Sequence, residues 1–172
     1  MKLSIITINY NNRSGLRKTI ESIVNQTLQV FEYIIIDGGS TDGSVEVIKE
    51  YADRIDYWVS EPDKGIYDAM NKGIDQAKGD YCLFMNSGDC LHDGSVLEDI
   101  MQELDGTSVI IGSVKLSDGR VFTSLHEVAI EYFYNKKSTD QSKRMNHQSS
   151  FIKTELLRKY HYDEKYKIVS DW

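Results

Sequence analysis

The chain has 172 residues, 40% of them hydrophobic, and a formal net charge of −7 at pH 7. This length suits one domain with a sizeable core, and the negative charge argues against non-specific binding to nucleic acid. No apolar run is long enough to span a membrane, so no transmembrane helix is expected.

Two features of the sequence predict a cytoplasmic protein. Met1 leads directly into a strand, so no signal peptide is expected. The two cysteines, Cys82 and Cys90, have no metal-ligand spacing and are expected to be isolated, reduced thiols.

Strand and helix patterns alternate over the first hundred residues. Four apolar runs have the length and composition of strands, at 3–8, 31–37, 57–59 and 81–85. Three segments carry apolar residues at helical spacing, at 13–26, 43–51 and 65–77. Ser95 with Glu98 predicts a capping box before a fourth helix. The order and the short connections predict an α/β fold with a mainly parallel sheet, covered by helices on both sides.

The pattern changes in the second part of the chain. Runs at 108–113 and 120–124 flank Ser117-Asp118-Gly119, a turn signal that predicts a hairpin. The remaining predicted elements are a short helix at 127–134, a mobile surface loop at 135–144, a strand at 149–152 and a last helix capped by Thr154. The chain stops at Trp172, directly after Val169-Ser170-Asp171, without a turn or cap, as if cut inside a structural unit.

Polar clusters follow three of the strands. Asp37 opens the segment 37–44 directly after an apolar strand, and similar polar segments follow the first and fourth strands at 9–12 and 86–89. The carboxyl ends of parallel strands meet at one edge of a sheet, where open α/β folds bind ligands. We therefore expect one shared site for a polar ligand that carries phosphate.

Each side chain in these clusters also has a structural interpretation, and the residues alone leave both open. Asp37 could form a turn or accept a hydrogen bond from a nucleotide base. Asp63 and Lys64 could simply begin a helix or meet a phosphate at its positive end. Asp89 could close a tight turn or hold a divalent cation, and Tyr10 could cover the core or stack on a base.

The order and spacing of five segments resemble the family 2 inverting glycosyltransferases of the GT-A fold. These segments are Thr7–Asn11, Asp37–Ser44, Glu61–Gly73, Asn86–Asp89 and His147–Phe151. The resemblance covers essentially the whole chain and implies a single domain over 1–172 with a Rossmann-like nucleotide-binding sheet. Within it, 1–106 would form the nucleotide-sugar-binding half and 107–172 a small antiparallel or mixed acceptor-side half, truncated at its C-terminus.

The resemblance also implies roles for individual residues. Tyr10 and the backbone around Ile8 would flank the base, and Asp37 would bind the base edge, which favours uracil. The base, diphosphate and sugar would be lined by Asp63, Lys64, Asp68, Asn71, Asn86, Ser87 and His147. Asp89 would hold Mn²⁺ or Mg²⁺ on the diphosphate. Asp171 would act as the general base, although neither it nor His147 carries a signal of its own.

The implied activity is transfer of a hexosyl or N-acetylhexosaminyl group, with inversion, from a nucleoside-diphosphate sugar, with UDP as the expected nucleotide. The acceptor would be a carbohydrate or a lipid-linked glycan in polysaccharide biosynthesis. The enzyme would be cytoplasmic, able to associate with the inner face of the plasma membrane and to form a homodimer, and the loop at 135–144 would act as a lid.

The chain departs from the family pattern in its metal motif, because Asn86, Ser87 and Gly88 stand where earlier acids are usual. This departure and the abrupt end after Asp171 leave open a nucleotide-sugar-binding domain without turnover. A sugar-phosphate nucleotidyltransferase is disfavoured, because such enzymes carry a glycine-rich basic loop after the first strand and this chain has Asn9–Arg13 there.

Overall fold

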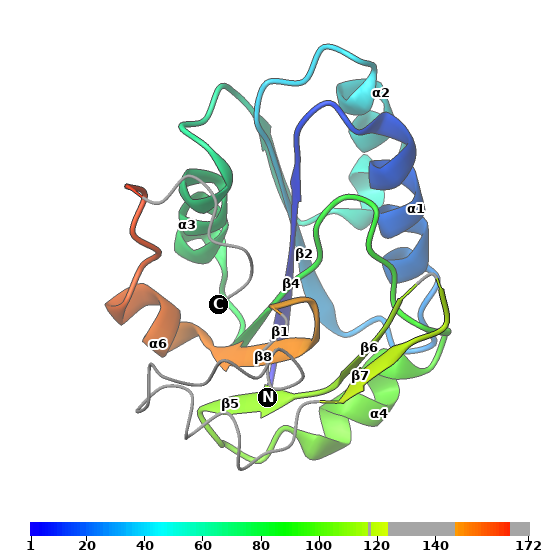
Figure 1. Ribbon diagram of the computed structural model, residues 1–172, viewed down its shortest axis with the longest axis vertical. Helices are drawn as coiled ribbons and strands as arrows, with labels where there is room; N and C mark the ends of the chain where they lie inside the picture. Colours follow the sequence, from blue (N-terminus) through cyan, green and yellow to red (C-terminus); the bar gives the residue numbers. More distant parts are fainter. Residues whose placement is uncertain (117, 124–146, 166–172) are drawn as a thin grey trace.

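The structure is a computed structural model that describes residues 1–116, 118–123 and 147–165 (Figure 1). The predicted helix at 127–134, the predicted lid at 135–144 and Asp171 lie outside these residues. No helix in the described ranges is both long and apolar enough to cross a membrane.

The alternation of strand and helix predicted for the first hundred residues is confirmed. The strands there are β1 (Leu3–Asn9), β2 (Phe31–Asp37), β3 (Tyr57–Ser60) and β4 (Tyr81–Phe84). The helices are α1 (Arg13–Val24), α2 (Ser44–Glu50), the short 3₁₀ helix η1 (Ala52–Arg54), α3 (Ile66–Gln76) and α4 (Val96–Glu103).

One sheet of six strands organises the molecule, in the order β3-β2-β1-β4-β8-β5. The first four strands in this order are parallel, whereas β8 (Ser150–Lys153) runs antiparallel to both β4 and β5 (Val109–Ile111). Figure 1 shows α1, α2 and α4 on one face and α3 and α6 (Thr154–Lys159) on the other. The predicted α/β class, mainly parallel with a smaller antiparallel region, is confirmed.

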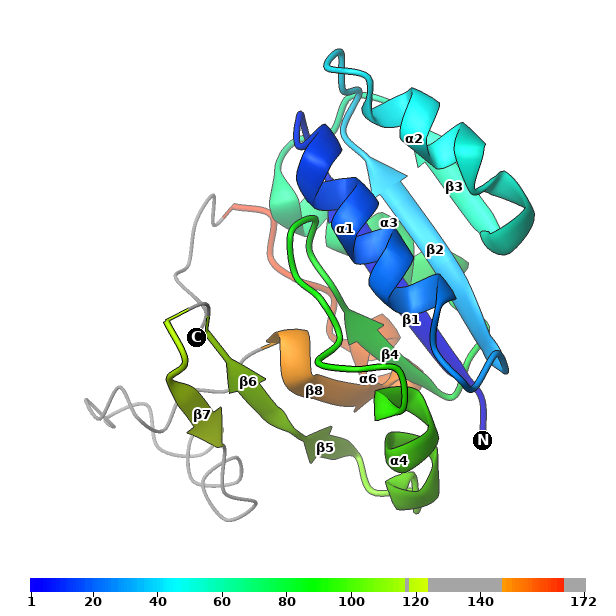
Figure 2. The same cartoon turned by 90° about the vertical axis from the view of Figure 1, so that its right-hand side faces the viewer.

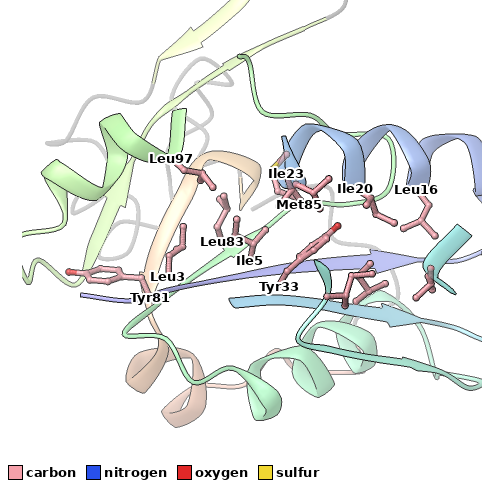
Figure 3. Close-up of a cluster of buried hydrophobic side chains, with 14 of the residues drawn as sticks. Leu3, Ile5, Leu16, Ile20, Ile23, Tyr33, Tyr81, Leu83, Met85 and Leu97 are labelled. Carbon is pink, nitrogen blue, oxygen red and sulfur yellow. The ribbon is translucent and has the colours of Figure 1, made fainter. Parts of the chain in front are cut away.

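Alternate residues of each central strand supply the two cores. Ile5 and Tyr33 face α1, and Figure 3 shows them with Leu16 and Ile20 of that helix. The intervening residue Ile6 faces α3 on the opposite side, so both faces of the strand are buried. This two-sided burial explains why the strands are continuously apolar rather than alternating.

Helix α3 lies unusually close to the sheet at Gly73. A Cβ added there would meet Ile6 Cγ2 at 2.5 Å, inside any normal contact. Because α3 follows β3 and carries the polar segment 61–65 at its start, this close packing helps to fix that segment over the edge of the sheet.

The second part of the chain agrees with the predictions only in part. The hairpin forms between β6 (Ser113–Lys115) and β7 (Val121–Thr123) (Figure 2), but the run 108–113 divides at Gly112, and its first half enters the main sheet as β5. The predicted strand at 149–152 is confirmed as β8, which follows the 3₁₀ helix η3 (His147–Ser149).

Both predicted helix caps are wrong. The Ser95 hydroxyl makes no capping bond and donates to Asp93 Oδ1 at 3.0 Å, while Glu98 accepts from Thr27 Oγ1 at 3.1 Å. Thr154 lies inside α6 and donates its hydroxyl to the Gly79 carbonyl at 2.7 Å. Distant partners have taken Glu98 and Thr154, whereas the Ser95 hydroxyl is taken by a residue two positions earlier.

Candidate functional site

The carboxyl ends of β1 to β4 meet at one edge of the sheet, as the polar clusters predict. From β1 the chain proceeds outward through β2 and β3 on one side, while β4 lies on the other side of β1. The interval between β1 and β4 is therefore the point at which the strand order reverses, and ligands of open α/β sheets bind in the crevice outside such a point.

Asp37, at the end of β2, is fully buried and is already saturated with hydrogen bonds. Its Oδ1 accepts from Asn9 Nδ2 at 2.7 Å and from Ser40 Oγ at 2.6 Å. Its Oδ2 accepts from the Ser40 amide at 2.9 Å and from Ser60 Oγ at 2.6 Å. A carboxylate offers about four acceptor positions, so the predicted direct contact between Asp37 and a base does not fit this geometry.

These hydrogen bonds also set the charge state of Asp37. Burial alone would raise the pKa of its carboxyl, but the bonds from Ser40, Ser60 and Asn9 outweigh burial and hold that pKa below its usual value. Asp37 therefore stays ionised and ties together the loops that follow β1, β2 and β3.

Tyr10 is presented to solvent by two anchored neighbours. Asn9 is bonded to Asp37, and Asn11 both donates its amide to Ser40 Oγ at 2.8 Å and accepts from the Thr41 amide at 2.9 Å. Tyr10 itself is 66% exposed. An aromatic ring held outward on a fixed loop can stack on a planar ligand.

Two predicted residues at the start of α3, Lys64 and Asp68, are engaged with each other and with other side chains of the protein. Asp68 accepts from the Lys64 amide at 3.0 Å and pairs with Lys72 Nζ at 3.5 Å. Lys64 is exposed, with its Nζ 3.7 Å from Glu164. The Asp68 carboxylate thus occupies part of the positive helix end that was predicted to meet a phosphate.

The Asn71 side chain is hydrogen-bonded to the backbone of Tyr162. Its amide nitrogen donates to the Tyr162 carbonyl, and its amide oxygen accepts from the Tyr162 N–H, both at 2.9 Å. The predicted contact of Asn71 with the donor would require this pair to open.

The segment 86–89 forms a tight turn against α1. The Asp89 amide donates to the Asn86 carbonyl at 2.9 Å, and Gly88 has a φ of 110°. Thr19 Oγ1 accepts from the Gly88 amide at 2.9 Å and contacts the Asp89 carbonyl at 2.7 Å. The turn also lies beside the end of β1, because the Ser87 amide donates to the Ile8 carbonyl at 3.1 Å.

His147 is brought to this turn from a distant part of the chain. Its Nε2 lies 2.8 Å from Asn86 Nδ2, although the two residues are 61 positions apart. The other amide atom of this residue, Asn86 Oδ1, is buried and has no hydrogen-bond partner within the described ranges. Asn86 and His147 were both predicted to lie in the site, and the structure places them together.

The residues present fit a divalent cation only as a shared site. Within the part of the chain that the structure describes, no group of three or more His, Cys, Asp or Glu could hold a metal ion. The Asp89 carboxylate and the buried Asn86 Oδ1 are oxygen ligands of the kind that Mg²⁺ and Mn²⁺ prefer. Magnesium often binds through one or two carboxylates together with substrate phosphates, so a bound diphosphate would have to complete the ligand set.

Sequence reasoning missed the residues that hold the site together. They are Asn9, Asn12, Thr19, Ser40 and Ser60. A usable signal existed for Thr19, since it stands in the apolar stripe of α1 beside Leu16 and Ile20, where a buried hydroxyl needs a partner.

A family model and several curated relatives all identify glycosyltransferases. The model for glycosyl transferase family 2 matches residues 4–164. An uncharacterised glycosyltransferase of Mycobacterium tuberculosis is 40% identical over 105 residues, which are 60% of this chain and 40% of that protein. A PGL/p-HBAD biosynthesis glycosyltransferase of Mycobacterium bovis is 35% identical over 97 residues, which are 55% of this chain and 38% of that protein. This chain thus spans about 40% of the length of these curated relatives.

Solved structures show the same fold at low sequence identity. Residues 1–349 of TarS from S. aureus superpose with a TM-score of 0.79 at 22% identity, covering 99% of this chain and 53% of that one. The same TarS fragment in complex with UDP gives a TM-score of 0.77 at 20% identity, with the same coverage. The mannosyltransferase PcManGT from Pyrobaculum calidifontis, in complex with GDP-Man and Mn²⁺, gives 0.67 at 19% identity, covering 94% of this chain and 47% of that one.

Proposed function

The chain belongs to glycosyl transferase family 2, and from this premise we propose that it transfers a sugar from a nucleoside-diphosphate sugar to an acceptor hydroxyl. Its membership confirms the resemblance inferred from the motifs. The observation that carries the proposal is the meeting of four loops at the carboxyl edge of the parallel strands. There hydrogen bonds made by the neighbours of Tyr10 join the segments that carry Tyr10, the saturated Asp37 and the turn at 86–89.

The base side of the proposed donor site is formed by the loops after β1, β2 and β3. Tyr10 would stack on the base. Asp37 would keep the loop that carries Tyr10 in place through its hydrogen bonds with Asn9 and Ser40. We assign UDP as the preferred nucleotide, in line with the TarS complexes with UDP and UDP-GlcNAc.

The diphosphate side of the proposed site is formed by the turn at 86–89. Asp89 and Asn86 would hold Mn²⁺ or Mg²⁺ together with the diphosphate, with His147 fixing the Asn86 amide. When bound, such a cation neutralises the charge that develops on the leaving diphosphate. Support comes from the donor types of these residues and from the Mn²⁺ in the PcManGT complex.

The proposed reaction is a single displacement with inversion. Asp171, which lies outside the described residues, would take the proton of the acceptor hydroxyl as general base. The hydroxyl oxygen then attacks the anomeric carbon from the face opposite the diphosphate. As the new bond to oxygen forms, the bond from that carbon to the diphosphate oxygen breaks, and the nucleoside diphosphate leaves with the electron pair.

The division into a donor half at 1–106 and an acceptor half at 107–172 is part of the proposal. It is supported by the change from parallel strands to the antiparallel β5, β8 and the β6–β7 hairpin. A carbohydrate or lipid-linked glycan is the proposed acceptor, in keeping with the relative assigned to PGL/p-HBAD biosynthesis.

Calorimetric titration with UDP, GDP and ADP, each with Mn²⁺ or with chelator, tests the donor site. We expect UDP to bind most tightly and chelator to weaken its binding. Incubation with a panel of UDP-sugars and glycan acceptors then tests for transfer. Binding without transfer would favour the donor-binding domain without turnover, and no binding of any nucleoside diphosphate would refute the donor site itself.

A further inference from the structure

We infer that Asp63, and not Asp37, is the side chain that selects the base of the donor, by accepting the N3 proton of uracil above Gly38. This inference rests on the proposed function and names the residue that gives it its nucleotide specificity. It reassigns a role that the sequence alone gave to Asp37.

Asp37 has no acceptor position to offer. It is 0% exposed, and its two oxygens accept four hydrogen bonds from Asn9, Ser40 and Ser60. A base could reach this carboxylate only by displacing one of these donors, which would leave a buried group unpaired.

The Asp63 carboxylate is fixed by one oxygen and open at the other. Its Oδ1 accepts from the Gly65 amide at 2.9 Å, which closes a short turn before α3. No donor within the described ranges is bonded to its Oδ2, and the residue is only half-buried. An acceptor that is held by one atom and open at the other is organised to receive a ligand before the ligand arrives.

Gly38 provides the space into which this oxygen points. A Cβ added to Gly38 would overlap Asp63 Oδ2 and would lie 3.2 Å from Cδ2 of the Tyr10 ring. The carboxylate oxygen and the ring edge therefore border the same small volume. Because the residue after Asp37 has no side chain, the carboxylate that reaches this volume comes from the β3 loop rather than from the β2 loop.

The β3 loop is held firmly over the β2 loop. The Glu61 amide donates to the Asp37 carbonyl at 3.0 Å. A Cβ on Gly39 would lie 3.1 Å from the nitrogen of Pro62, which shows how closely the two loops approach. The position of Asp63 relative to Tyr10 is thus set by backbone contacts rather than by a flexible side chain.

A carboxylate at this point distinguishes bases by their hydrogen-bonding edge. Uracil has an N3–H group that can donate a hydrogen bond to the carboxylate. Cytosine has an unprotonated N3 in the same place, whose lone pair would face the negative oxygen. If the base stacks on Tyr10 with its N3 edge toward Asp63, the site should therefore bind uracil more tightly than cytosine.

The first test needs no variant and uses the 172-residue chain. Calorimetry would compare UDP with CDP and with UDP methylated at N3, a ligand that keeps the ring and the diphosphate but lacks the proton. We expect the methylated ligand and CDP to bind about 10- to 100-fold more weakly than UDP, as for a buried polar group left without its partner. If UDP and its N3-methyl form bind equally, the inference is overturned while the proposed function stands.

A second test changes the acceptor itself. Asp63→Asn keeps an oxygen for the Gly65 amide and can present an NH₂ group in place of Oδ2, so it should lose most of the preference for UDP over CDP. Asp53→Asn, on the exposed η1 helix, is the matched control and should keep that preference. An Asp63→Asn protein with wild-type discrimination would refute the assignment.

A third test moves the carboxylate across the gap. Gly38 does not have the positive φ found at Gly39 and Gly43, so its backbone accepts a side chain. The double variant Gly38→Asp with Asp63→Ala should recover part of the UDP preference that Asp63→Ala alone loses. If the double variant has a normal thermal unfolding transition but recovers none of the UDP preference, then a carboxylate at Gly38 does not reach the space that Asp63 Oδ2 occupies. If the wild-type chain binds no nucleoside diphosphate, the proposed function falls as well.

Discussion

Asp37 on the base side of the candidate donor site and Asn86 on its diphosphate side differ in how completely their polar atoms are satisfied. On the base side, around Asp37, four donors fill both carboxylate oxygens of a fully buried residue. On the diphosphate side, Asn86 Oδ1 is buried without a partner in the described ranges, and so is Asn9 Oδ1 beside Asp37. An unpaired buried polar group costs about 1–3 kcal/mol. Asp37 is therefore satisfied by folding alone, whereas Asn86 keeps an oxygen for what binds beside it.

This difference suggests a division of labour within one edge of the sheet. The base side is rigid and provides selectivity, because its loops are joined to one another before any ligand arrives. The diphosphate side keeps an oxygen available for a cation or a donor, at some cost in stability. The predictions below test whether binding, stability and chemistry separate along this line.

The largest expected effect is on turnover. If the two sides of the edge hold the donor, removing the proposed general base should leave donor affinity unchanged. Asp171→Asn should lower kcat by about 10²- to 10⁴-fold, the usual contribution of a general base, with the Kd for UDP within about twofold of wild type. Transfer assays and calorimetry on the same preparations would check this. Wild-type turnover in the variant would exclude Asp171 and direct attention to His147.

The next effect is on stability and separates Asp37 from Asp63. Asp37→Asn replaces an acceptor oxygen with an NH₂ group facing existing donors, and should lower the free energy of unfolding by about 3 kcal/mol. The same substitution at the half-buried Asp63 should change it by less than about 0.5 kcal/mol. Urea unfolding of both variants measures the difference. Equal losses would mean that the base side is not organised around Asp37.

The stabilising effect of Asp37 should also depend on pH. Because hydrogen bonds lower the pKa of its carboxyl in the folded state from the ordinary 3.8, its contribution is complete above that value. It is lost as the pH falls through the lower, folded-state pKa. The stability gap between wild type and Asp37→Asn should therefore be constant near neutrality and narrow below about pH 4.

The fold was largely predictable because its signals are local and repeated. The boundaries of β2 agree with the apolar run at 31–37, and α1 begins at Arg13 as its apolar stripe indicates. The division of 108–113 at Gly112 was not predictable, because β5 pairs with β8 some forty residues further along the chain. Local pattern does not show which distant strand will compete for an edge.

The site was predictable in membership but not in roles. The motifs identified Asp37, Asp63 and Asn86. The sequence pattern of an acidic residue at a strand end is the same, however, whether or not its oxygens already accept hydrogen bonds within the fold. Only the tertiary structure shows that Ser60 closes one oxygen of Asp37 and that His147 reaches Asn86. The false capping box at Ser95 has this cause only for Glu98, which Thr27 reaches from a distant part of the chain, since the Ser95 hydroxyl is taken by the nearby Asp93.

A smaller effect is expected from the exposed ring on the base side. Tyr10→Ala should weaken UDP binding by about 1–3 kcal/mol, the range for aromatic stacking on a base, whereas Tyr10→Phe should retain most of the affinity. Neither change should alter thermal stability, because the ring is largely exposed. Calorimetry with UDP measures the affinities. A Phe variant as weak as the Ala variant would show that the hydroxyl, and not the ring face, makes the contact.

The smallest effect on stability should come from substituting Asn86 on the diphosphate side. Asn86→Ala removes a hydrogen bond to His147 but also removes the buried, unpartnered Oδ1, and these two changes oppose each other. We expect the free energy of unfolding to change by less than about 0.5 kcal/mol. Asn12→Ala is the matched comparison, because Asn12 caps α1 through the Gly15 amide and bonds the Ser87 carbonyl.

Loss of that cap should cost about 1 kcal/mol, so Asn12→Ala should be the less stable of the two variants. Affinity should show the opposite order in the presence of Mn²⁺, with Asn86→Ala binding UDP more weakly than Asn12→Ala. The reason is that the Asn86 oxygen has no role in the described fold and is left for the ligand. Urea unfolding and calorimetry on the two variants measure these stabilities and affinities. A strongly destabilised Asn86→Ala would mean that the Asn86 amide stabilises the fold instead of serving the ligand.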